Sequence, residues 1–158
     1  MTTKATLQRI ITTVILTSLL SSCIGDTIQH QYRHISKDGW SRNDTIVFEL
    51  PPTNSECRYA VDTEIRTARQ FPYQRICLVR ELALQVPLRM HKDTICIETR
   101  NSDTFFENKG VTIKVYSHSD TTLVLKERQT GYMKLYHIMS REVLPYIADI
   151  GIRVRAIR

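Results

Sequence analysis

The sequence is poor in glycine, tryptophan and long apolar runs, and these shortages exclude several classes of protein. Its 158 residues include only five glycines and one tryptophan, and no glycine-rich phosphate loop is present. No serine is framed by a nucleophile elbow. No apolar run reaches the ~20 residues of a membrane-spanning helix. The four cysteines lack metal-ligand spacing. We therefore expect no catalytic residue, no metal, no cofactor and no small-molecule substrate.

The one apolar segment, residues 10–20, lies near the start of the chain. It follows Lys4 and Arg9 and runs into the stretch LLSSC, which ends at Cys23. A basic start, a short apolar run and small residues are typical of an export signal. With a cysteine after the small residues, the stretch resembles a bacterial lipobox, in which the thiol is acylated and the chain is cut just before it. The sequence predicts a cleaved lipoprotein signal peptide over residues 1–22 and lipid attachment at Cys23, where two or three acyl chains give stable anchoring. The alternative is a chance cysteine after an ordinary signal.

Charge and the residues after Cys23 bear on location. Loss of residues 1–22 removes Lys4 and Arg9, so 20 Lys+Arg face 16 Asp+Glu and the net charge falls from +6 to +4. Outside the cytoplasm this mild excess favours anionic membrane lipid, lipopolysaccharide or an acidic protein face over nucleic acid as a partner. A plain solvated surface without a charged partner is the simpler interpretation. No aspartate follows Cys23 directly and no acidic run comes after it. We expect the periplasmic leaflet of the outer membrane.

From residue 37 onward the hydrophobic pattern has period two. Isoleucine, phenylalanine and leucine alternate with Val47 and Glu49, for example, in the segment 44–50. No segment has a helical period, apart from a possible single turn at 140–144. The sequence predicts an all-β, antiparallel two-layer β-sandwich of about eight strands over residues 37–158, after a lipidated flexible tether over 23–36. The candidate strands are 44–50, 58–66, 75–87, 93–99, 111–117, 121–127, 133–139 and 150–157.

Cysteines and histidines in the mature chain form no recognisable site. Cys57, Cys77 and Cys96 are odd in number, so at least one is unpaired or pairs between molecules. The sequence leaves their pairing open, and we interpret them as small buried or half-buried thiols in strands. His30 and His34 have a spacing that could hold a metal on a helix, but no third ligand is near.

A short pattern repeats before several strands. Asp-Thr-Ile or Asp-Thr-Thr places Thr27, Thr45, Thr94 and Thr121 after an aspartate. One interpretation is that aspartate ends a turn and threonine begins a strand. The other is O-glycosylation, because the pattern is similar to the acceptor sequence of exported proteins in the Bacteroidetes.

Two longer stretches carry a family resemblance. The first, Tyr32–Pro51, contains an aromatic residue, then Gly-Trp, Asp-Thr and a phenylalanine that enters a strand. The second, Gly131–Val154, contains Gly-Tyr, Met-Ser-Arg and the segment IADIGI. With the lipobox, these stretches resemble the gliding-motility lipoprotein family GldH of the Bacteroidetes. The chain departs from the family pattern between Thr99 and Val111, where a glycine- and tryptophan-rich passage is usual.

The resemblance implies an outer-membrane lipoprotein with protein partners in the gliding and type IX secretion apparatus, and it supplies no catalytic residues. A glycan-binding envelope lipoprotein with a β-sandwich module is the alternative. It would need a row of exposed aromatic rings, drawn from Tyr32, Trp40, Tyr73 and 105–106. A periplasmic hydrolase would need a cleft that gathers histidines and carboxylates.

Overall fold

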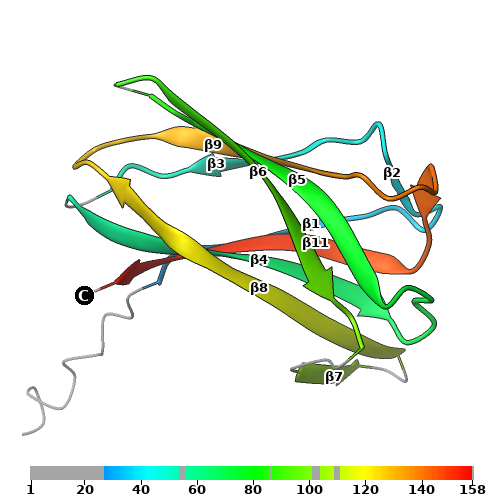
Figure 1. Cartoon of the computed structure of the whole chain (residues 1–158). Coiled ribbons are helices and arrows are strands. Elements are labelled where there is room, and N and C mark those ends of the chain that lie inside the picture. Colours follow the sequence, from blue (N-terminus) through cyan, green and yellow to red (C-terminus); the bar gives the residue numbers. More distant parts are fainter. Residues whose placement is uncertain (1–26, 54–55, 86, 101–103, 109–110, 158) are drawn as a thin grey trace, which may run out of the picture.

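The computed structural model describes residues 27–53, 56–85, 87–100, 104–108 and 111–157. Within this part of the chain all regular elements are strands, and they form an antiparallel sandwich of two main layers (Figure 1). The predicted fold class is confirmed. No helix long and apolar enough to cross a bilayer occurs among these residues. The signal peptide and Cys23 lie outside them.

One layer is a five-stranded sheet with the order β1-β11-β4-β8-β7. The other layer is a four-stranded sheet with the order β3-β9-β5-β6, and β2 pairs with β10 at one end of the sandwich. The bounds of the first sheet are β1 Thr27–His34, β4 Cys57–Ala68, β7 Thr104–Asn108, β8 Val111–Leu125 and β11 Ile147–Ile157. Those of the second are β3 Ile46–Leu50, β5 Arg75–Leu84, β6 Arg89–Glu98 and β9 Gly131–His137, and the short pair is β2 Trp40–Ser41 and β10 Val143–Leu144.

The core forms because alternate side chains of facing strands point between the layers. In β3 and β9 the alternation is complete: every second residue is buried and the others are exposed or half-buried. Central strands contribute the largest fully buried side chains, which include Tyr59 and Ile65 from β4 and Ile76 and Leu78 from β5. This burial fixes the register, because a shift by one residue would turn each apolar set to solvent.

The expected tether is wrong over most of its length. Residues 27–34 form β1, an edge strand that pairs with β11 from Thr27↔Arg155 to His34↔Asp149. Sequence periodicity misses this strand because β1 has almost no apolar alternation: its sequence is TIQHQYRH. Backbone pairing and polar contacts hold it instead. The domain therefore begins by Thr27.

Other differences concern strand bounds. The candidates 111–117 and 121–127 are one strand, β8, which has a bulge between Asp120 and Leu123. In β8 three steps, Asp120 to Leu123, oppose two steps in β4, Val61 to Tyr59. The possible helical turn at 140–144 contains β10 instead.

Cys77 and Cys96 form a disulfide, which corrects their interpretation as thiols. They oppose each other across β5 and β6, with Cα atoms 4.1 Å apart. Both lie on the outward face of the four-stranded sheet, where Cys77 is half-buried and Cys96 exposed. Closing a loop over 19 positions of sequence contributes about 3 kcal/mol in the chain-entropy model.

Candidate functional site

The five-stranded sheet carries two buried carboxylates on the face that points away from the core. They are Asp62 and Glu64 of β4, with 2% and 3% of each residue exposed. Alternation in β4 turns them away from the core, because Val61 and Ile65 face inward. A solvent-side carboxylate is normally exposed, and burying a charge is costly unless it is paired. The side chains that cover these two carboxylates therefore define the site.

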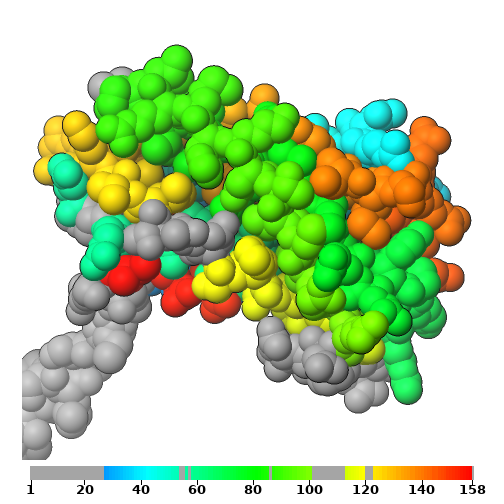
Figure 2. Space-filling view, viewed as in Figure 1, coloured from blue at the N-terminus to red at the C-terminus, as the bar shows by residue number. Residues whose placement is uncertain are grey.

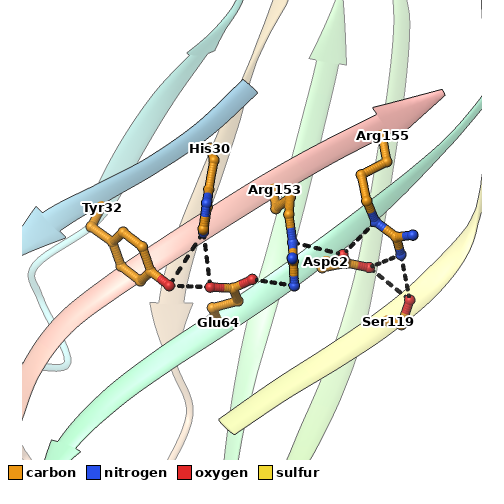
Figure 3. A network of polar contacts seen from close by, with 7 residues as sticks. All are labelled: His30, Tyr32, Asp62, Glu64, Ser119, Arg153 and Arg155. Carbon is orange, nitrogen blue, oxygen red and sulfur yellow. Dashed lines mark hydrogen bonds and ion pairs between the residues drawn. The ribbon is translucent and has the colours of Figure 1, made fainter. Parts of the chain in front are cut away.

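Two arginines from β11 cover Asp62. Arg155 donates from Nε to Asp62 Oδ2 at 2.9 Å and from Nη2 to Asp62 Oδ1 at 3.0 Å. Ser119 of β8 donates to the same carboxylate at 2.6 Å. Arg153 lies between the acids, with Nε 3.2 Å from Asp62 Oδ2 and Nη2 2.8 Å from Glu64 Oε1. Figure 3 shows Arg153 bridging the two acids.

Strand β1 covers Glu64. The Tyr32 hydroxyl donates to Glu64 Oε2, and His30 Nε2 lies 3.1 Å from the same oxygen (Figure 3). The Tyr32 ring packs over Gly151 of β11, its cross-strand neighbour. A Cβ at position 151 would lie 2.5 Å from the Tyr32 ring, so glycine is required for this close approach. The Arg66 guanidinium stacks on the same ring, 3.5 Å from its centroid.

The surrounding groups fix the protonation states in this network. Burial raises the pKa of the Asp62 carboxyl, but hydrogen bonds from Arg155 and Ser119 and the charges of Arg155 and Arg153 outweigh it. The pKa of Asp62 is therefore held below its ordinary value. Burial, together with the hydrogen bond to Glu64, raises the pKa of Tyr32 to about 12. Asp62 thus stays ionised at neutral pH, and Tyr32 stays protonated as a donor.

The network is balanced in charge. The carboxylates of Asp62, Glu64 and Asp149 lie among the guanidinium groups of Arg66, Arg153 and Arg155. Carboxylates that are already paired with arginines and hydroxyls are poor general bases, since most of their lone pairs are engaged. The network links side chains of β1, β11, β4 and β8 and thereby holds these four strands together. His30 and Tyr32 of β1 thus have a structural role in it.

A groove of about 1030 Å³ lies beside this network, where the edge strands β1 and β3 of the two sheets approach each other. Gln29 Nε2 donates to the Glu49 carbonyl oxygen at 2.8 Å and thereby links the two edges. Amides, charges and a ring line the groove together with Pro51 and Pro52. The polar lining residues include Gln29, Gln31, Arg33, Glu49, Gln85, Tyr132 and Lys134.

Trp40 and His137 form a second buried polar spot, at the end where β2 and β10 pair. Both residues are 0% exposed, and their rings meet edge to face with centroids 5.2 Å apart. Trp40 Nε1 donates to the Asp44 carbonyl at 3.0 Å, and His137 Nε2 lies 3.1 Å from the Trp40 carbonyl. Burial lowers the pKa of His137, so the ring stays neutral. Trp40 is therefore unavailable for stacking on a sugar.

The structure scatters the residues that the sequence suggested as sites. Thr27, Thr45 and Thr94 are exposed, each on a different strand or turn, and Thr121 lies in β8 with its side chain outside the description. His30 and His34 lie on one face of β1 but contact separate carboxylates, Glu64 and Asp149. Among the described residues no group of three or more potential ligands could hold a metal.

The site and fold define a class: an all-β sandwich domain whose edge strand β1 is held by a buried ion-pair network. The model of the GldH lipoprotein family matches residues 27–154, so the chain belongs to the GldH lipoprotein family. The chain is also similar to the gliding motility lipoprotein GldH of Flavobacterium johnsoniae, with 24% identity over 144 residues that cover 86% of this chain and 89% of the relative. The match begins at Thr27, the first residue of β1. This family is not a known enzyme family.

Proposed function

We propose that this protein is a non-catalytic accessory lipoprotein of the gliding and type IX secretion apparatus, anchored to the outer membrane through Cys23 and facing the periplasm. The observation that carries the proposal is the family match over the folded domain, together with a relative that is named for gliding motility. The lipobox at residues 19–23 supports the anchor.

The groove between β1 and β3 is the surface that best suits a protein partner. Both strands are sheet edges, and an edge presents backbone donors and acceptors to an added segment. Val47 of β3 is 42% exposed beside amides and charges of both signs. This mixed lining fits an extended polypeptide better than a single charged ligand.

Photo-crosslinking in the native envelope tests this proposal. A crosslinking amino acid replaces Val47 in the groove, and a matched control replaces Glu98, an exposed residue on the opposite edge strand, β6, of the same sheet. We expect the Val47 position to recover components of the secretion or gliding apparatus and the Glu98 position to recover none. Identical protein adducts from both positions would contradict docking in the groove.

Mass spectrometry of the same protein addresses the anchor and the modifications. Acyl mass on Cys23 would support the anchor, and Cys23→Ala should leave the chain unprocessed or released from membranes. Glycan mass on Thr27, Thr45, Thr94 or Thr121 would identify acceptors. Recovery of only lipopolysaccharide or polysaccharide by the crosslinker would favour the glycan-binding alternative, which must do without Trp40.

A further inference from the structure

One end of the sandwich gathers loops and strand ends around Thr27, the first described residue, which follows Cys23 by four positions. The two sheets end together here: Gly131 opposes both Leu50 and Leu84, and the Thr53 carbonyl accepts from the Arg128 amide. Thr27 enters the five-stranded sheet at the same end, opposite Arg155. In Figure 1 the start of β1, the tip of the β5–β6 hairpin and the end of β11 all lie on the left. We call this surface the anchor end.

The distance from Cys23 to this end is short. Three residues separate Cys23 from Thr27, and an extended chain advances at most about 3.6 Å per residue. The start of β1 thus lies within about 14 Å of the Cys23 Cα. A headgroup layer is several ångströms thick. If Cys23 is acylated, the anchor end must face the membrane at close range.

The anchor end carries the most exposed large apolar side chains of the described residues. Leu88 and Met90, at the tip of the β5–β6 hairpin, are 77% and 74% exposed. Val124 of β8 and Ile157 of β11 are 52% and 37% exposed, and Arg58 of β4 lies between them in the register. Figure 2 shows the hairpin tip projecting at this end, above the turn between β8 and β9.

Positive charge accompanies these apolar groups. In the turns and strand ends that form the anchor end, the described residues include four exposed cations, Arg58, Arg89, Lys126 and Arg128. The exposed acids among the described residues there are three, Glu49, Glu56 and Glu127, and Glu127 lies 3.8 Å from the Arg128 guanidinium. Apolar tips flanked by cations suit the boundary between acyl chains and anionic headgroups.

We propose that the anchor end is a second membrane contact, in which Leu88 and Met90 enter the boundary between headgroups and acyl chains while the cations lie among phospholipid phosphates. The proposal rests on acylation of Cys23. Two contacts fix the orientation of the domain, whereas the acyl anchor alone lets it rotate. The groove, which includes Gln29 and Pro51 near the anchor end, is then held in a fixed orientation relative to the membrane.

Quenching by brominated lipid tests the contact in the full acylated chain. Leu88→Trp places a fluorophore at the tip, and Trp40, which is fully buried at the other end, is a constant internal reference. The control is Ile138→Trp, at a residue that is 46% exposed just beyond β9, on the side away from the anchor end. Each protein is reconstituted into phosphatidylethanolamine vesicles that contain phosphatidylglycerol, with and without bromine on the acyl chains.

We expect brominated lipid to remove most of the added fluorescence of Leu88→Trp and to leave Ile138→Trp and the parent protein unchanged. Equal, weak quenching at positions 88 and 138 would overturn the proposal. An emission shift at position 88 that grows with protein density in the vesicles, without quenching, would also overturn it. That result would indicate that position 88 contacts a second copy of the protein and not the lipid. Unchanged Trp40 emission in the parent and near-ultraviolet circular dichroism of each variant check folding.

Vesicle flotation separates failure of the contact from failure of the anchor. A chain without acyl groups fails to float at high salt, and its intact mass lacks the lipid. An acylated chain that floats but shows no quenching at position 88 disproves the contact alone. In a second variant, Arg89→Glu with Arg128→Glu, we expect quenching of Leu88→Trp to fall in vesicles with phosphatidylglycerol. Unchanged quenching there would overturn the role of the cations.

Discussion

Two buried polar spots in this domain solve the same physical problem in opposite ways. On the outer face of the five-stranded sheet, guanidinium and hydroxyl groups surround Asp62 and Glu64, and they keep Asp62 charged. At the β2–β10 end, His137 stays neutral because burial lowers the pKa of its ring and outweighs the backbone hydrogen bonds, which raise it. The difference shows that the neighbouring strand decides the charge state: β11 supplies arginines to one spot, and β2 supplies Trp40 to the other.

Disrupting the neutral spot around Trp40 and His137 should lower the free energy of unfolding the most. Trp40→Ala removes a fully buried ring that packs on His137 and leaves a cavity in the core. We expect a loss of about 3–5 kcal/mol in the free energy of unfolding, measured by urea denaturation. Trp40→Phe, which keeps a ring but loses the donor to Asp44, should cost less. Equal losses in both variants would show that the hydrogen bond matters more than the packing.

Disrupting the charged spot around Asp62 should lower the free energy of unfolding by a somewhat smaller amount. Asp62→Ala leaves Arg153 and Arg155 without their shared carboxylate. We expect a loss of about 3 kcal/mol, at the low end for a buried pair because both arginines are partly exposed. The control is Glu98→Ala, whose partner Arg75 is exposed, and it should cost about 1 kcal/mol or less. Similar costs at both sites would refute the view that burial makes the network different.

The packing of β1 against β11 can be tested at Gly151. Gly151→Ala forces the Tyr32 ring away from its position and weakens its bond to Glu64, so we expect a loss of about 1–3 kcal/mol. Once Tyr32→Ala has removed the ring, the same substitution should cost much less. A double-mutant cycle in urea denaturation measures this coupling, and additive costs would show that the ring and the glycine do not act together.

The two spots should also respond to acid in different pH windows. Burial lowers the folded-state pKa of His137, so the unfolded chain binds the proton first and stability falls as the pH drops below about 6.5. The pKa of Asp62 is lowered too, so its contribution is present above its unfolded value and is lost only below about pH 3.9. The urea midpoint, measured across this pH range, should fall in two steps. His137→Phe should remove the fall that begins near pH 6.5, and Asp62→Asn should remove the fall below about pH 3.9. A fall that survives its substitution would be assigned to another group.

Much of the architecture could be predicted from the sequence. The period-two pattern predicts the antiparallel sandwich. The alternation in β4 places Asp62 and Glu64 on one face of the strand and Val61 and Ile65 on the other. The candidate site could not be predicted, because β1 has polar residues on both faces and resembles a linker in any apolar pattern. The alternation His30-x-Tyr32-x-His34 was the available signal, but it names no partner strand.

The sequence by itself determined the strand alternation and the side of the sheet on which each charge lies, because both depend on local backbone geometry. Its lipobox likewise predicts the anchor at Cys23. Only the tertiary structure decided that β1 joins β11, that Asp62 and Glu64 are buried, and that Cys77 meets Cys96. These outcomes depend on which strands become neighbours. That choice is made by packing between residues far apart in the chain, and no local pattern records it.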